Sequence, residues 1–91
     1  MLDITTYEDT AQNRAGFVVR SESREEVEFA LGKLRDILSA RTADNSAEVR
    51  GPLSEKDGTF IGAVRGSAIF VKKDFDKIVQ LFRRDLNGAS A

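Results

Sequence analysis

Residues 58–66, Gly-Thr-Phe-Ile-Gly-Ala-Val-Arg-Gly, carry a glycine at every fourth position among apolar residues. Such spacing occurs in packed membrane helices, in phosphate-binding loops and in β-hairpins. A membrane helix needs about 20 mainly apolar residues, but Asp57, Arg65 and Lys72 lie before, within and after this stretch. A soluble helix would lose roughly 1 kcal/mol at each glycine relative to alanine. The pattern therefore disfavours a helix of either kind.

A phosphate-binding loop places its glycines in a strand-to-helix turn, where backbone N–H groups face the anion. Here they run through an apolar, β-branched segment, and no Gly-Lys-Ser/Thr motif follows. We therefore predict a hairpin of strands 59–65 and 68–71, joined by a two-residue turn at Gly66-Ser67. Gly62, in mid-strand, indicates a bulge or the close approach of a helix.

Two helices flank this hairpin. Ser23 and Glu26 have the spacing of a capping box, in which each side chain bonds the other residue's backbone N–H. Apolar residues recur at helical spacing downstream, which predicts a helix over 24–41. A second helix is expected from Asp74, with Asn87-Gly88 as its C-terminal stop.

The other apolar segments predict strands. Residues 14–20 are short, apolar and β-branched, and 47–53 has a strand pattern interrupted by Pro52, which places that end on an edge or at the limit of the strand. Ile4 to Tyr7 can form a further short edge strand. We expect one α+β domain over 1–91: an antiparallel sheet of four to five strands with two helices on one face, in the order (β)βαβββα. Residues 1–13 and 88–91 are expected to be loosely ordered. The expected sheet core is Phe17, Val19, Val49, Phe60, Val64, Ile69 and Val71.

Composition excludes several kinds of chemistry. The 91 residues include no His and no Cys, so imidazole and thiolate metal ligands, cysteine nucleophiles and histidine bases are ruled out. Paired carboxylates such as Asp74 and Asp76 fall in first turns of helices, where the helix dipole explains them. We predict that the protein is not an enzyme and binds no metal or cofactor.

The sequence also bears on location. The first residues show neither the basic nor the apolar region of a signal peptide, and no apolar run approaches a membrane span. The net charge of −1 creates no general attraction to anionic surfaces. We expect a cytoplasmic protein without a membrane partner.

One face of the predicted sheet is left without helices. The hairpin register would pair Val64 with Ile69 and Ala63 with Phe70, so that strand alternation turns Ile61, Arg65 and Phe70 away from the helices, with Arg50 nearby. Exposed apolar patches of this kind often mark a partner or homodimer interface. The alternatives are that the N-terminal segment covers this face or that the register is shifted by one.

Phe29 falls opposite the apolar stripe of the first helix. It could anchor a partner, stand as a single exposed aromatic, or pack under the N-terminal segment. The leading hypothesis is a small non-catalytic protein-binding module, an adaptor, inhibitor or accessory subunit, that contacts another protein or a second copy of itself. Its contact residues would be Phe29, Ile61, Arg65 and Phe70.

The second helix supports an alternative. Basic side chains gather on it and its approach, and such residues bind the RNA or DNA backbone, although interleaved aspartates also fit a solvated face. The predicted order helix, three strands, helix, with Lys72-Lys73 before the last helix and Gly51-Pro52 in the first strand, is similar to double-stranded-RNA-binding domains over residues 23–87. That resemblance implies reading of A-form RNA shape. The nucleic-acid contacts would be Lys72, Lys73, Lys77 and Arg84.

The chain departs from that family in three ways. A strand precedes the first helix, the final hairpin is short, and Phe75, Ile78 and Val79 replace alanine-rich packing. We therefore do not assign the chain to the family.

Overall fold

The computed structural model describes residues 2–41 and 47–90, without the side chains of 41, 69, 70 and 85–90. The chain is an α+β domain with the element order ββαββα, in which a short helix and a 3-10 turn precede the last helix. The elements are β1 (Asp3–Asp9), β2 (Arg14–Ser21), α1 (Arg24–Arg41), β3 (Glu48–Ser54), β4 (Phe60–Ser67), α2 (Ala68–Val71), η1 (Lys72–Asp74) and α3 (Phe75–Ser90).

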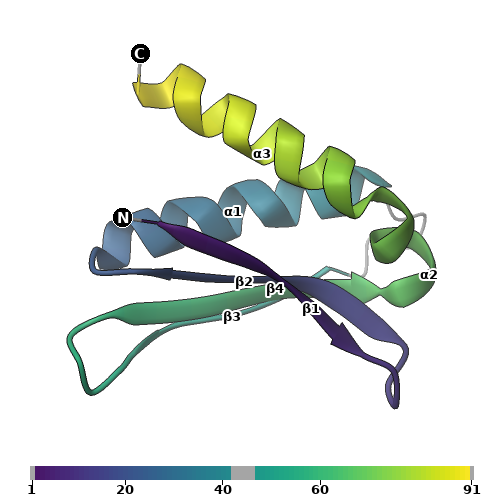
Figure 1. Cartoon of the computed structure of the whole chain (residues 1–91), viewed down its shortest axis with the longest axis horizontal. Coiled ribbons are helices and arrows are strands. Elements are labelled where there is room, and N and C mark those ends of the chain that lie inside the picture. The colour runs from purple at the N-terminus through teal and green to yellow at the C-terminus, as the bar shows by residue number, and fades with distance from the viewer. Residues whose placement is uncertain (1, 42–46, 91) are drawn as a thin grey trace.

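The four strands form one antiparallel sheet in the order β1-β2-β4-β3. The long helices α1 and α3 both lie over the same face of this sheet (Figure 1). The molecule measures 33 × 32 × 18 Å, and Figure 1, which looks along the shortest axis, shows the helix layer stacked on one side of the sheet. Within the described residues, the other face of the sheet has no helix over it, as the sequence predicts.

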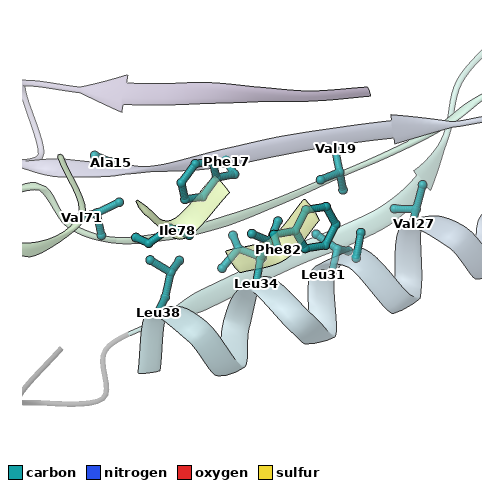
Figure 2. Close-up of a cluster of buried hydrophobic side chains, with 12 residues drawn as sticks. Ala15, Phe17, Val19, Val27, Leu31, Leu34, Leu38, Val71, Ile78 and Phe82 are labelled. Atoms are coloured by element: carbon teal, nitrogen blue, oxygen red, sulfur yellow. The ribbon is translucent and has the colours of Figure 1, made fainter. Parts of the chain in front are cut away.

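The core lies between the sheet and the helices (Figure 2). Phe17 of β2 meets Phe75 of α3 edge to face, with ring centroids 5.4 Å apart. Leu34 and Leu38 of α1 and Phe82 of α3 complete the centre of this layer. Among the described residues, the buried apolar side chains are Ala15, Phe17, Val19, Val27, Ala30, Leu31, Leu34, Leu38, Val64, Val71, Ile78 and Phe82.

The expected sheet core is confirmed in large part. Phe17, Val19 and Val64 are buried on β2 and β4, and Phe60 packs against the core in part. Val71 is also buried, but it belongs to the helix α2 and not to a strand. Val49 was wrongly placed in the core, since 40% of it is exposed. It lies opposite Val64 but on the edge strand β3, so no further strand covers its outer side. The side chain of Ile69 lies outside the described residues.

The start of α1 is capped by three side chains. The Ser23 hydroxyl accepts the Glu26 N–H at 3.3 Å, as the capping box predicts. The Glu26 carboxylate does not accept the Ser23 N–H, because the buried hydroxyl of Ser21 lies between them. Ser21 accepts that N–H at 3.1 Å and donates to Glu26 at 3.0 Å.

The expected hairpin at Gly66-Ser67 is wrong. Both residues belong to β4 and pair with Ala15 and Arg14 of β2, so the strand continues where the turn was expected. The Ala68 N–H then donates to the Asn13 carbonyl at 2.9 Å, and Ala68–Val71 turns into the helix α2. Only two strands therefore separate the long helices, which also removes the third strand of the RNA-binding resemblance.

Other boundaries differ as well. β1 pairs with β2 along its whole length, so the edge strand expected at Ile4 to Tyr7 is present and extends over residues 3–9, within a segment expected to be loosely ordered. α3 continues past Asn87-Gly88 to Ser90, so the expected stop is wrong.

At Gly62 the expected close helix approach is confirmed, because a Cβ there would lie 2.5 Å from Leu31 Cδ1 of α1.

Candidate protein-binding surface

We use the term open face for the side of the sheet turned away from α1 and α3. Phe17 and Val64 are buried towards the helices, and alternate residues along a strand point to opposite faces. Pairing then aligns the outward residues of adjacent strands in rows. The central part of the open face consists of Thr5, Tyr7, Gly16, Val18, Glu48, Arg50, Leu53, Ile61, Ala63 and Arg65.

An apolar hollow of about 230 Å³ lies on this face. Residues of three neighbouring strands line it: Val18, Arg50, Leu53, Ile61, Gly62 and Ala63. Leu53 is 63% exposed, while Val18, Ile61 and Ala63 are half-buried. Arg50 is the only charged residue in the lining.

A bulge in β3 brings Leu53 to the open face. Arg50 lies opposite Ala63, and regular pairing would then place Pro52 opposite Ile61. The register instead shifts between Arg50 and Leu53, so that Leu53 lies opposite Ile61. Gly51 supports this shift with a φ of 89°, a conformation that favours glycine. Without the extra residue, alternation would turn Leu53 towards the helices.

A polar row crosses the sheet beside the hollow. Tyr7, Gly16, Arg65 and Glu48 are consecutive partners across β1, β2, β4 and β3. Arg65 Nε donates to Glu48 Oε2 at 2.8 Å, and only 16% of the Arg65 side chain is exposed. The hydrogen bond to Glu48, and then the interaction with the Tyr7 side chain, raise the pKa of Arg65. The guanidinium is therefore held in one position.

Three further arginines, Arg14, Arg20 and Arg50, lie near this row or near the hollow. The hydrogen bond from Arg65 lowers the pKa of Glu48, and the charges of Arg14 and Arg50 lower it further. Arg20 is bound to Glu55 at 2.8 Å. Arg50 makes no ion pair within the described residues, and it lines the hollow.

The structure brings together only two of the four predicted protein contacts. Ile61 and Arg65 lie on the open face. Phe29 projects from α1 in the helix layer, where it is 42% exposed and Lys33 Nζ lies 5.8 Å from its ring centroid. Phe70 belongs to α2, so the strand pairing that placed it beside Ile61 does not exist.

Of the four predicted nucleic-acid contacts, one is bound to β1 and three are aligned on the last helix and its approach. Lys72 Nζ bonds Glu8 of β1 at 2.7 Å. Lys73, Lys77 and Arg84 are exposed, and their spacing of four and seven residues places them along one side of the last helix and its approach. No ion pair involves these three within the part of the chain that the structure describes.

Sequence reasoning missed Val18, Leu53 and Tyr7 as residues of the open face. The signal for Leu53 was present, since Gly51-Pro52 inside a strand pattern is typical of a bulge. Val18 and Tyr7 depended on the order of the strands, which local patterns do not give.

Comparisons of the chain with protein-family models, with curated proteins and with solved structures find no match. Among the described residues, no helix has both the length and the apolar character needed to cross a membrane. The same residues contain no group of three or more carboxylates placed to hold a metal ion. The open face is thus the candidate site that the geometry supplies.

Proposed function

We propose that the protein is a small non-catalytic protein-binding module, an adaptor, inhibitor or accessory subunit, that contacts its partner through the open face. The observation that carries this proposal is the apolar hollow on the side of the sheet without helices. Pockets for small molecules measure roughly 300–1,000 Å³. A hollow of about 230 Å³ better suits one or two side chains of a protein partner.

The surroundings of the hollow also support a protein partner. Protein interfaces combine a central apolar patch with a polar rim, and arginine is enriched in them. Here Leu53 and Ile61 supply the apolar patch, while Arg50 and Arg65 lie on its rim. Because Arg65 is already fixed by Glu48, its contact with a partner would cost little side-chain entropy.

The test is the substitution Leu53→Asp. Since Leu53 is 63% exposed, we expect the free energy of unfolding to change by no more than about 0.5 kcal/mol, while complex formation with a partner or a second copy is lost. Denaturant unfolding and light scattering after size exclusion measure the two effects. Phe29→Asp, in the helix layer, is the matched control and should leave the complex intact. A Leu53→Asp protein that unfolds, or that forms the same complex, contradicts the proposal.

A second candidate function uses the other side of the molecule. The exposed, aligned cations Lys73, Lys77 and Arg84 favour contact with the backbone of RNA or DNA. Affinity for a short duplex should then fall steeply with salt, by roughly one log–log slope unit for each phosphate contact, and Lys77→Glu should reduce that slope. Binding that is absent or insensitive to salt would remove this candidate.

A further inference from the structure

The outer edge of β1 is a second surface without a partner. β1 is the terminal strand of the sheet, and within the described chain no strand pairs with its outer side. Its seven residues pair with β2 in one unbroken register, from Asp3 opposite Arg20 to Asp9 opposite Arg14. A terminal strand of this kind presents a row of free backbone N–H and C=O groups.

The two edges of the sheet are built differently. β3 carries the Gly51-Pro52 bulge, and a bulge or a proline blocks the addition of another strand. β1 has no proline, no lysine and no bulge. Its centre, Ile4 to Tyr7, is uncharged and includes two threonines, which favour strand pairing. The edge of β1 is therefore the one that can accept a strand.

The charges on β1 argue against a second copy as that strand. In the antiparallel register that pairs all seven residues of two β1 strands, Asp3 of one copy lies opposite Asp9 of the other at both ends. A shift by one residue in one direction places Asp3 opposite Glu8, and a shift in the other direction leaves Asp3 outside the paired residues Ile4 to Asp9. Like charges directly opposite each other destabilise a strand pair. β1 itself has no cation to offset them.

The same charges favour a basic strand. Asp3 and Asp9 both point to the open face, and each lies opposite an arginine of β2. Neither makes an ion pair among the described residues, and Arg20 is bound to Glu55 instead. A cation opposite each aspartate on an added strand would complete two rows of alternating charge. Asp3 would lie between Arg20 and one cation, and Asp9 between Arg14 and the other. Opposite charges across a strand pair stabilise it.

We infer that the edge of β1 binds an extended peptide segment of a partner by strand addition, and that this segment carries basic residues opposite Asp3 and Asp9. Main-chain hydrogen bonds supply affinity in this mode of recognition, and side chains supply specificity. The inference does not depend on the apolar hollow, because it uses Asp3, Asp9 and the backbone groups of β1 at the border of the sheet.

The probe is a synthetic peptide as long as β1, with alternating threonine and valine between a lysine at each end. Its matched control has glutamate in place of both lysines. We expect the lysine peptide to bind, to protect backbone amides of β1 from hydrogen exchange, and to bind more weakly as salt rises. The glutamate peptide should bind at least about tenfold more weakly, because two attractive pairs become repulsive.

A protein variant makes the reciprocal test. Asp3→Lys combined with Asp9→Lys should reverse the preference, so that the glutamate peptide binds better. Glu28→Lys combined with Asp36→Lys changes the net charge equally on the exposed surface of α1 and should leave the preference unchanged. Circular dichroism verifies that both variants are folded. Equal binding of the two peptides, protection outside β1, no binding, or a preference that the control variant also reverses would overturn the inference.

Discussion

Gly16 shows how a single residue determines the spacing of the two central strands. A Cβ at this position would lie 1.9 Å from the Val64 carbonyl oxygen and 2.6 Å from Arg65 Cα. These are backbone atoms of β4, so the strand itself would have to move. The missing side chain also leaves room in the polar row between Tyr7 and Arg65.

Gly16→Ala should therefore destabilise the protein by about 2–3 kcal/mol, because overpacking here displaces backbone. Chemical denaturation gives the free energy of unfolding. Gly32→Ala is the control: a Cβ at Gly32, in α1, meets nothing within 4 Å, and alanine should add up to about 1 kcal/mol through helix propensity. A Gly16→Ala protein as stable as the wild type would contradict this account.

The pair of Glu48 and Arg65 makes a prediction about pH. The pKa of Glu48 is lowered from its ordinary value of 4.5, chiefly by the hydrogen bond from Arg65. A carboxyl group with a lowered pKa stabilises the folded state above its unfolded pKa and loses that effect as the pH falls through its folded pKa. Wild type should therefore be more stable than Glu48→Gln above about pH 4.5, and the difference should shrink below it.

Denaturant unfolding of both proteins across this pH range measures that difference, with high salt as a second variable. Salt should reduce it, since Glu48 is exposed to solvent. A difference that stays constant down to the lowest pH would show that the charge of Glu48 is not its source.

At the scale of the element, local signals predicted α1 fully and β4 only in part. The apolar spacing and the cap of α1 lie within its own residues, and its observed bounds, Arg24–Arg41, are the predicted ones. The end of β4 depends on the pairing of Ser67 with Arg14, far away in the sequence. Gly66-Ser67 would suit a tight turn, but the pairing of these two residues with β2 keeps them in the strand.

The cap of α1 supplies the prediction at this scale. Ser21→Ala removes the hydroxyl that bridges the Ser23 N–H and the Glu26 carboxylate. Since Ser21 is buried, with 3% exposed, we expect a loss of about 1–2 kcal/mol in the free energy of unfolding. Ser54→Ala, at an exposed position of β3, should stay within about 0.5 kcal/mol. Equal effects of the two substitutions would contradict a bridging role for Ser21.

For the whole molecule, the sequence predicted that one sheet face would lack helices but misjudged what lies on it. Alternation along β4 placed Ile61 and Arg65 there, as observed. Leu53 lies on the same face because of the bulge in β3. Val18 lies on it beside the residues of β4 because β2 and β4 are neighbours in the sheet. Phe29 lies in the opposite layer, so no single contact can use all of the residues that the sequence indicated.

The measurement that tests the central proposal most directly is a comparison of photo-crosslinking from the two layers. A photo-crosslinking amino acid replaces Leu53 on the open face in one protein, and Glu28 on the outer side of α1 in another. We expect one discrete protein adduct from position 53, either with a partner or with a second copy, that is lost when Ile61→Asp is added. Adducts from position 28 alone, or an adduct from position 53 that Ile61→Asp leaves unchanged, would contradict the proposal.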